Sequence, residues 1–437
     1  MKNKLKEKIK SKKITVGIIG LGYVGLPLVV RFCEENINVI GFDIDNEKIK
    51  LLANGKTYIK HIPNEKIISS LKSGFEPTSN FGLISKVDAI LICVPTPLGV
   101  HNEPDLSFIL NTINQIKLYL KKDQLIILES TTYPGTTDEQ IIPILQESFK
   151  SGDIKIGDNF FVGYSPERED PGNINFTTKN IPKLVSGYSK RCLSSVCELY
   201  SLIVDEIVPV SSLKVAEMSK VLENIHRAVN IGLVNELKMV ADKMNIDIYE
   251  VINAAATKPF GFTAYMPGPG LGGHCIPIDP FYLTWKAKEI GMTTRFIELA
   301  GEINTSMPHY VVKKVTDALN KNGKPIKNSK ILILGLAYKK NLDDLRESPS
   351  LKLIDILHEK GALISYCDPY FEEIPITRKI NLPLKGKPLN PKVLKSADLV
   401  LLATDHDIFD YDLIEKESQL IVDTRGRLNK SSKIIRA

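Results

Sequence analysis

A glycine fingerprint near the start of the chain constrains its fold more than any other feature. Ile14 to Ile19 is predicted to be a buried strand, and Gly20-Leu21-Gly22-Tyr23-Val24-Gly25 follows it and opens a predicted helix. A second predicted strand, Asn38 to Phe42, ends at Asp43. A strand, a glycine turn, a helix and a later acid are typical of a dinucleotide-binding fold.

Each part of this fingerprint has a physical role in holding NAD. The glycines let a pyrophosphate approach the backbone, and the helix N-terminus supplies N–H groups and a positive dipole. The acid can accept hydrogen bonds from ribose hydroxyls and repels a 2′-phosphate, which favours NAD over NADP. The predicted NAD-binding residues here are Gly20, Gly22, Tyr23, Val24, Gly25 and Asp43.

Apolar strands and helices continue to alternate after the fingerprint, as in a parallel sheet. Further predicted strands are Val87 to Val94, Gln124 to Leu128, Phe160 to Tyr164, Lys183 to Ser186 and Ile207 to Val210. Ligands bind beyond the carboxyl ends of such strands, so Thr96, Ser130 and Thr131 are placed to contact cofactor or substrate. Each of these hydroxyls is equally compatible with a helix cap.

The middle of the chain combines a long predicted helix with an irregular loop. Residues 211–245 contain no proline, and Lys220 and Asn224 lie one turn apart on the same face. The loop from Pro267 to Pro280 holds four glycines, four prolines, Cys275 and, four residues later, Asp279. A thiol beside an ionisable group suits covalent catalysis, although a buried structural cysteine is the alternative.

A third region repeats the strand–turn–helix pattern without the full glycine fingerprint. A strand at Lys330 to Leu334 leads into a loop with Lys339 and Arg346. These cations are placed to face an anionic ligand, and each is equally compatible with a plain surface charge. The predicted fold class is α/β, with two Rossmann-like doubly wound domains joined by a long central helix and a helical middle domain. The expected domains are residues 1–210 for NAD, 211–310 with the cysteine loop, and 311–437 for the substrate.

Composition excludes several other classes of protein. The net charge of +6 is mild and dispersed, so we expect no nucleic-acid partner. Six widely spaced cysteines without a CxxC pair predict reduced thiols, a cytoplasmic protein and no metal site. The lysine-rich arm, Met1 to Lys13, is expected to be a solvated tail, and no membrane span is expected.

These motifs together resemble the UDP-glucose/GDP-mannose 6-dehydrogenase family over nearly the whole chain. The loop Gly272-Gly273-His274-Cys275-Ile276-Pro277-Ile278-Asp279-Pro280 and its flanks are most similar to the UDP-N-acetylglucosamine 6-dehydrogenase branch. The resemblance implies an oxidoreductase that oxidises a primary alcohol to an acid through a cysteine thiohemiacetal and thioester, for polysaccharide or glycan biosynthesis.

The resemblance also assigns roles to residues of this sequence. It implies Cys275 as nucleophile, Lys220 as the lysine that stabilises oxyanions and Asn224 as its partner. It also implies Asp279 and Glu167 as acids that handle water, and Thr131 as a hydroxyl that positions water. Substrate contacts are expected from Arg227, Lys258, Gly272, Lys339 and Arg425. Relatives that oxidise UDP-glucose have an arginine where Lys258 is the nearest candidate here, and a lysine offers no bidentate fork. For His274, positioning is favoured over catalysis.

Several alternatives remain open at this point. UDP-ManNAc, UDP-GalNAc and UDP-glucose are alternative substrates to UDP-GlcNAc. A two-electron hydroxyacid-type dehydrogenase would not need Cys275, and a non-catalytic nucleotide-sugar sensor would ordinarily have lost part of the Lys220, Asn224, Cys275 and Asp279 set. The family also implies a homodimer, or a larger homo-oligomer, built on the long helix.

Overall fold

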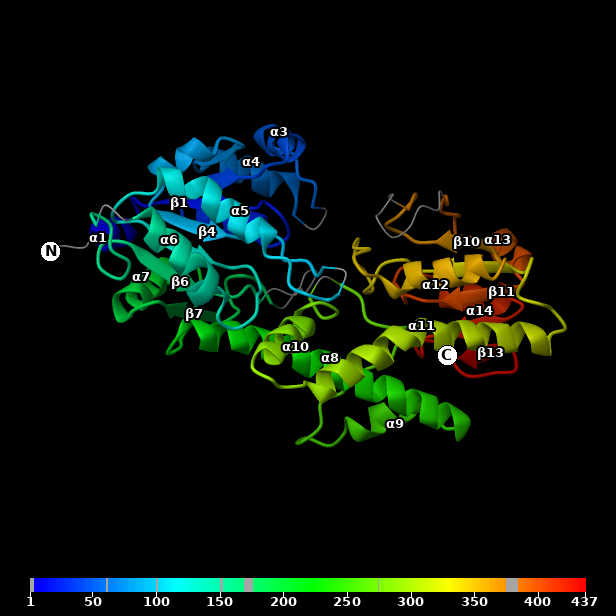
Figure 1. The fold of residues 1–437 in the computed structure, drawn as a ribbon. Coiled ribbons are helices and arrows are strands. Elements are labelled where there is room, and N and C mark those ends of the chain that lie inside the picture. Colours follow the sequence, from blue (N-terminus) through cyan, green and yellow to red (C-terminus); the bar gives the residue numbers. More distant parts are fainter. Residues whose placement is uncertain are drawn as a thin grey trace. The chain divides into compact units, whose positions relative to one another are not determined.

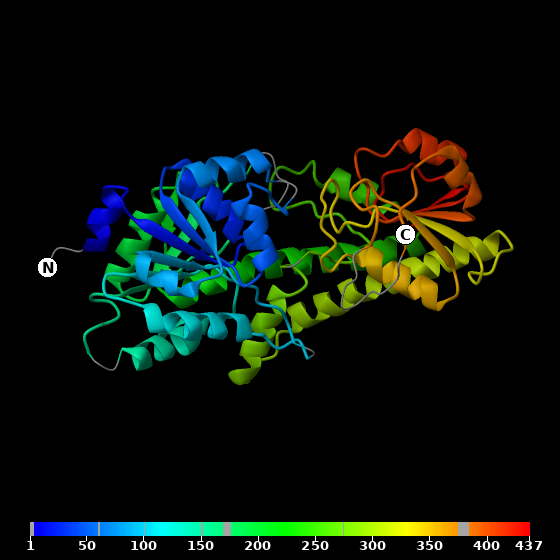
Figure 2. The ribbon, with the colours of Figure 1, turned by 90° about the horizontal axis from the view of Figure 1, so that it is seen from above.

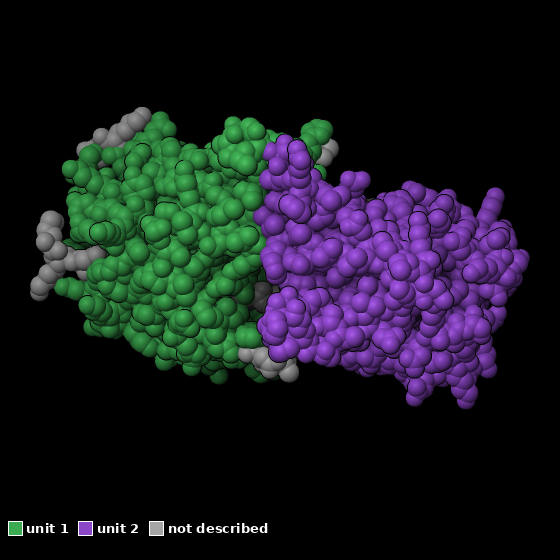
Figure 3. Space-filling model, turned by 90° about the horizontal axis from the view of Figure 1, so that it is seen from below, with its two compact units in different colours: residues 1–223, 281–292 green, residues 224–280, 293–437 purple. Residues whose placement is uncertain are grey.

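The computed structural model describes residues 4–59, 62–99, 101–149, 152–168, 176–273, 275–374 and 384–437. The chain divides into two units, coloured separately in Figure 3. Unit 1 contains residues 1–223 and 281–292, and unit 2 contains residues 224–280 and 293–437. The division falls within two helices, α8 (Leu213–Lys243) and α10 (Asp279–Glu289), each of which contributes residues to both units.

Within the described part of unit 1, eight strands form one sheet in the order β3-β2-β1-β4-β5-β6-β7-β8 (Figure 1). Its pairs are parallel except for β6 and β7, which are antiparallel. All the predicted strands are present, and β3 had not been predicted. The bounds are β1 Thr15–Ile19, β2 Asn38–Phe42, β3 Phe75–Thr78, β4 Ala89–Ile92, β5 Leu125–Leu128, β6 Phe161–Tyr164, β7 Lys183–Gly187 and β8 Ile207–Pro209.

Helices cover both faces of this sheet because successive strand residues point to opposite sides. Helices α2 and α7 cover one face, and α5 and α6 cover the other (Figures 1 and 2). Ile18 and Leu91 pack on the first face, whereas Ile19 and Ile92 pack on the second. Each face therefore has its own apolar core. The helices of unit 1 are α1 Lys4–Lys10, α2 Gly25–Glu34, α3 Asn46–Ala53, α4 Asn64–Lys72, η1 Phe81–Lys86, α5 Ser107–Ile116, η2 Lys117–Tyr119, η3 Thr137–Ile141, α6 Ile142–Ser148 and α7 Lys190–Tyr200.

Unit 2 is built on a second parallel sheet in the order β10-β9-β11-β12-β13. Helices α11 and α12 cover one face and α13 and α14 the other. Both sheets together confirm the predicted α/β fold with two Rossmann-like domains. The bounds are α9 Ile248–Ala255, α11 Arg295–Lys321, β9 Lys330–Leu334, α12 Pro349–Glu359, β10 Leu363–Cys367, α13 Pro391–Ser396, β11 Leu399–Leu402, α14 Tyr411–Glu417, β12 Ile421–Asp423 and β13 Ile434–Arg436.

The prediction of two separate helices before the second sheet was wrong. Separate helices were expected at Arg295 to Ile303 and Tyr310 to Asn320, but α11 runs without a break from Arg295 to Lys321 with Pro308 inside it. A proline removes one backbone hydrogen bond and crowds the preceding turn. Met307, just before Pro308, and Val311, one turn after it, are fully buried. The packing of this helix therefore outweighs the tendency of proline to end it.

The expected solvated tail was also wrong. Helix α1 packs on α7 and buries Leu5 and Ile9, which are each 1% exposed. Because these residues are four apart, they form an apolar stripe on one side of the helix. Lys6 pairs with Glu198 at 2.6 Å, so the lysines rim the packed face. No described helix combines the length and apolar character that a membrane crossing requires.

Helix α8 carries an unusual buried lysine. Lys238 is 3% exposed, and its amine has no hydrogen-bond partner among the described residues. Burial and the nearby positive charge of Arg425 lower its pKa to about 7. Below that pH the folded protein must hold an unpaired buried ammonium. Between the lowered pKa and the ordinary lysine pKa, the unfolded chain binds more protons than the folded protein. The free energy of unfolding therefore rises with pH over this range, and the cost of burying the Lys238 charge falls.

We expect Lys238→Met to stabilise the protein near neutral pH, because it removes the cost of burying an unpaired charge. The gain in unfolding free energy should be about 1 to 3 kcal/mol at about pH 6 and smaller at about pH 9.5. Urea titrations at both pH values measure this difference. Lys243→Met on the exposed part of the same helix serves as control and should be nearly neutral at both. An equal loss of stability for Lys238→Met at both pH values would contradict the prediction.

Candidate active site

The glycine turn after β1 has the geometry that a dinucleotide needs. Gly20 has a positive φ of 91°, and a Cβ added to it would lie 2.7 Å from the carbonyl oxygen of Cys93. A Cβ on Gly25 would lie 2.0 Å from the Gly20 carbonyl, so helix α2 must begin with a glycine here. Gly22 instead faces open space, with nothing within 4 Å of an added Cβ. A pyrophosphate can therefore approach the backbone at Gly22, and the residues fit NAD.

The acid at the end of β2 is held in a fixed orientation. Asp43 is 8% exposed and accepts hydrogen bonds from Leu21 N–H and Asp45 N–H, both at 3.0 Å. Lys48 lies 3.8 Å from the same carboxylate. The bond from Leu21 ties the acid to the glycine turn, so both parts of the predicted NAD site belong to one rigid element.

The predicted hydroxyls at the ends of β4 and β5 bind each other's strands. Thr96 Oγ1 donates to Thr131 O at 2.8 Å, and Ser130 Oγ donates to Val94 O at 2.7 Å. Tyr282 of α10 donates its hydroxyl to Thr96 O. Neither hydroxyl caps a helix; both bonds fix the two strand ends side by side. Thr131 remains partly exposed.

Glu167 and Lys220 meet in unit 1. Glu167 lies in the segment after β6, and its Oε2 is 3.8 Å from Lys220 Nζ on α8. Their side chains are 15% and 7% exposed, so their attraction is only weakly screened. An acid and an ammonium of opposite charge in one shielded place can move a proton and stabilise an oxyanion.

Unit 2 brings together Asn224, Asp279 and the turn that carries the cysteine. Asn224 Nδ2 donates to Asp279 Oδ2 at 2.5 Å, and Asp279 is 2% exposed. Asp279 N–H and Ile278 N–H both donate to Cys275 O, at 2.8 and 3.0 Å. The cysteine therefore stands in a hydrogen-bonded turn immediately before α10, and its side chain is partly exposed.

The glycine-rich approach to the cysteine packs against the loop that carries Lys339. A Cβ on Gly272 would lie 2.5 Å from Tyr338 Cβ, so only glycine permits this approach. Gly273 N–H donates to Arg346 O at 2.9 Å. The guanidinium of Arg425 donates through Nε to Ala403 O at 2.7 Å. Gly272, Lys339 and Arg425 thus belong to connected parts of unit 2.

The remaining predicted contacts lie on the surface or outside the described residues. Arg227 and Lys258 are exposed, and Lys258 Nζ lies 5.0 Å from the ring centroid of Phe260. The guanidinium of Arg346 is engaged by Asp344, with an NH2–Oδ2 distance of 2.6 Å. His274 is outside the described residues, so its role stays a prediction.

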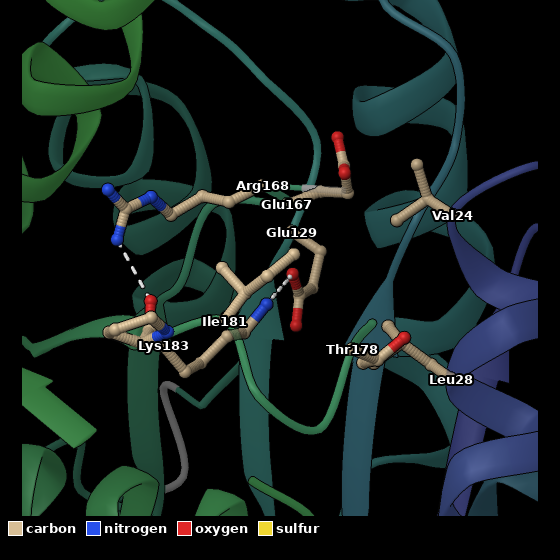
Figure 4. A pocket seen from close by; sticks show the side chains of 9 residues that line it. Val24, Leu28, Glu129, Glu167, Arg168, Thr178, Ile181 and Lys183 are labelled. Atoms are coloured by element: carbon tan, nitrogen blue, oxygen red, sulfur yellow. Dashed lines mark hydrogen bonds and ion pairs between the residues drawn. The ribbon is translucent and has the colours of Figure 1, made fainter. Parts of the chain in front are cut away.

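Several buried polar residues were not predicted from the sequence. Glu217 on α8 is fully buried and accepts from Gly135 N–H at 2.5 Å and from Thr137 N–H at 2.9 Å, which ties the segment after Thr131 to the helix of Lys220. The only sequence signal was an acid on an apolar helical face. Glu129 and Lys183 form a buried ion pair at 2.7 Å (Figure 4). Here the sequence signal was one ionisable residue beside each of two apolar strands: Glu129 follows β5, and Lys183 begins β7.

Unit 2 repeats the hydrogen bond between the turn after one strand and the acid after the next. Here the acid also contacts a histidine. Leu336 N–H donates to Asp368 Oδ2 at 2.6 Å, as Leu21 does to Asp43. His406 is fully buried and its Nε2 lies 3.2 Å from the same Asp368 oxygen. Because the ring nitrogen Nδ1 of His406 accepts from Asn341 N–H at 3.0 Å, Nε2 carries the proton. This carboxylate is therefore engaged from within the domain.

The six cysteines, all of them among the described residues, form no disulfide. Cys33, Cys93, Cys192 and Cys367 are buried, and burial raises the pKa of Cys33 to about 12 and that of Cys367 to about 11. Burial also raises the pKa of the partly exposed Cys197. These thiols are poor nucleophiles at neutral pH.

Three models of one protein family match the sequence in order. The NAD binding domain of the UDP-glucose/GDP-mannose dehydrogenase family matches residues 14–204, its central domain 214–306 and its UDP binding domain 332–430. These matches extend over most of the chain.

Curated relatives and solved structures agree with the family match. Protein CapL of Staphylococcus aureus is 37% identical over 95% of this chain and 96% of its own length. The UDP-N-acetyl-D-glucosamine 6-dehydrogenase of Pseudomonas aeruginosa is 34% identical over 91% of this chain and 92% of its own. A Pyrococcus horikoshii structure described as a UDP-D-ManNAc dehydrogenase aligns with a TM-score of 0.85 and 30% identity, covering 97% and 99% of the two chains.

We expect iodoacetamide to alkylate Cys275 faster than any other cysteine, by about tenfold or more, because the other thiols are buried or have raised pKa values. Peptide mass mapping after short exposures at about pH 8 measures the order of labelling. Cys275→Ser provides the control, since it should abolish the fast phase. Faster labelling of Cys33 or Cys192 would contradict the described burial.

Proposed function

Because the chain belongs to the UDP-glucose/GDP-mannose dehydrogenase family and is an NAD-dependent nucleotide-sugar dehydrogenase, we propose that it oxidises C6 of a UDP-N-acetylhexosamine to a carboxylate. The proposed preferred substrate is UDP-GlcNAc, and the product serves polysaccharide or glycan synthesis. The reaction consumes one water and two NAD for each sugar, and it releases two NADH and protons.

The observation that carries the proposal is a partly exposed thiol in the turn that leads into Asp279 and its partner Asn224. A plain two-electron dehydrogenase does not need a nucleophile at this place. A four-electron oxidation does, because the aldehyde must not escape between the two oxidations. Bound NAD supplies the hydride acceptor in both.

Cys275 is the proposed nucleophile. Its sulfur adds to the aldehyde carbon to form a thiohemiacetal, and loss of a hydride from that carbon leaves a thioester. Lys220 and Asn224 are proposed to stabilise the oxyanions that form at the same carbon. Both residues belong to α8 and are four positions apart in the sequence.

Water then cleaves the thioester between carbon and sulfur and returns the thiol. Glu167, 3.8 Å from Lys220, is proposed to accept the proton of the attacking water. Asp279 is proposed to assist, and Thr131 to position the water. The hydrogen bond from Asn224 to Asp279 keeps that carboxylate oriented.

The proposed substrate contacts follow the chemistry of a uridine diphosphate. Lys339 and Arg425 supply positive charge in the domain matched by the UDP binding model. Gly272 lies against the Lys339 loop, and Tyr338 of that loop fills the space that a side chain would take. Exposed Arg227 and Lys258 are proposed to reach the sugar or diphosphate. The preference for UDP-GlcNAc rests on the cysteine-loop motif, and similar proteins include a UDP-N-acetyl-D-glucosamine 6-dehydrogenase and a UDP-D-ManNAc dehydrogenase.

We also propose that the enzyme is a homodimer built on α8. Leu233, Leu237 and Val240 repeat every three or four residues on this helix, and Met244 continues the spacing just past its last residue. These four side chains are 44% to 64% exposed. The same spacing occurs earlier in α8 at Val215, Met218 and Leu222. A stripe of this period can pack against a second copy of itself, and each buried leucine would contribute about 1.5 to 3 kcal/mol.

The first test is the number of NADH formed per sugar consumed, with excess NAD and each of UDP-GlcNAc, UDP-ManNAc, UDP-GalNAc and UDP-glucose. We expect two NADH per sugar, because both oxidations occur before release, and fastest turnover with UDP-GlcNAc. Cys275→Ser should lower acid formation by about a thousandfold or more, since it removes the nucleophile. One NADH per sugar would reject the thioester route, and preference for another sugar would reject UDP-GlcNAc.

The second test concerns the dimer. Leu237→Glu should convert the protein to monomers, because a charge would be buried in an apolar contact between the two helices. Size-exclusion chromatography with light scattering gives the mass. Lys243→Glu, on the same helix but off the stripe, is the matched control and should leave the mass of the wild type. A wild-type monomer, or a Leu237→Glu dimer, would refute this interface.

A further inference from the structure

Glu167 is one of the residues that line a pocket in unit 1. Glu129, Lys183 and Glu167 line it together with Arg168 and the start of α2 at Val24 (Figure 4). These charged side chains come from three different strand ends, β5, β6 and β7. Of them, the reaction proposed above uses only Glu167.

Lys183 is the centre of the buried contacts in this pocket. Its Nζ lies 2.7 Å from Glu129 Oε2, donates to Pro166 O at 3.2 Å and is 5.0 Å from the ring centroid of Tyr200. The Tyr200 hydroxyl donates to the other oxygen of Glu129. The lysine and glutamate side chains are 10% and 0% exposed. Glu129 and Tyr200 therefore hold the ammonium in one position.

That position bears directly on Glu167. Pro166, whose carbonyl accepts from Lys183, is the residue immediately before Glu167 in the chain. Arg168, immediately after it, donates through NH1 to Pro182 O at 2.9 Å and through NH2 to Glu223 Oε1 at 2.7 Å. The carbonyl before Glu167 and the side chain after it are thus both bonded to the chain at Pro182 and Lys183, where β7 begins.

The charges in the pocket depend on one another. Burial raises the pKa of Glu129, and Lys183 opposes this rise. Without the lysine, the buried carboxylate would favour its neutral form and the hydrogen bond to Pro166 would be lost. A buried ion pair contributes little net stability compared with an apolar pair of similar volume. Its hydrogen bond to the carbonyl of Pro166, the residue before Glu167, therefore points to a role in the reaction.

We propose that Lys183, held by Glu129 and Tyr200, is a positioning residue that fixes Glu167 for the hydrolysis of the thioester. This inference rests on the proposed function, in which Glu167 accepts a proton from water. Lys183 touches neither substrate nor cofactor in this role. It sets the direction of the Glu167 carboxylate, and both hydride transfers proceed without it.

The test is Lys183→Met, which keeps the length of the side chain and removes its charge. In rapid mixing with excess NAD and UDP-sugar, we expect a burst of two NADH per active site at the wild-type rate. A steady rate lowered by about tenfold to a hundredfold should follow, because general acid–base catalysis is worth about that much or more. KM values should stay within about twofold. Mass spectrometry should find the acyl group accumulated on Cys275.

Controls separate positioning from a structural role. Lys179→Met removes a 57% exposed lysine near the same strand and should match the wild type. Tyr200→Phe removes only one hydroxyl, so it should fold, and it should slow the steady rate by about twofold to fivefold without changing the burst. If Lys183→Met does not fold, Tyr200→Phe decides the inference. Equal slowing of burst and steady rate, or no slowing at all, would overturn it.

The same experiment distinguishes failure of this inference from failure of the proposed function. One NADH per sugar in the wild type would overturn the proposed function, and the positioning role with it. Two NADH per sugar in the wild type, with a folded Lys183→Met variant of unchanged steady rate, would overturn the positioning role alone.

Discussion

The parallel hydrogen-bonded ladder is the constraint on which the rest of unit 1 depends. Parallel pairing of β1, β2, β4, β5 and β6 brings their carboxyl ends to one edge of the sheet. The glycine turn, Asp43, Thr96, Glu129 to Thr131, and Ser165 to Glu167 all follow one of these strands. The sheet therefore makes neighbours of residues that lie far apart in the chain, whether or not their own side chains contact one another.

The same constraint operates in unit 2 with a different outcome. Asp368 follows β10 and receives Leu336 N–H, as Asp43 receives Leu21 N–H in unit 1. His406, which follows β11, engages that carboxylate from inside the domain. Two strand–turn–acid elements of the same construction thus present different chemistry, because the side chain at one neighbouring strand end differs.

Buried hydrogen bonds in both units connect segments whose positions apolar packing alone does not fix. Asn235 of α8 donates to Asn304 of α11 at 2.9 Å and accepts from Gly268 N–H at 3.0 Å, which holds the start of the cysteine loop. Apolar packing tolerates small shifts, whereas a hydrogen bond in a buried setting has one geometry. Hydrogen bonds of this kind hold Gly268, at the start of the loop that carries Cys275, and Pro166, the residue before Glu167.

The sequence by itself determined most of the strands, though not β3 or β13, together with the NAD fingerprint, the long helix and the candidate residues. These depend on local periodicity and on glycines with local steric roles. Whether those residues act as proposed stays a prediction. Only the tertiary structure decided that α11 continues through Pro308, that Leu5 and Ile9 are buried, and that Glu129 pairs with Lys183, 54 residues away. Burial and pairing depend on which segments the sheet brings together, and no local pattern carries that information.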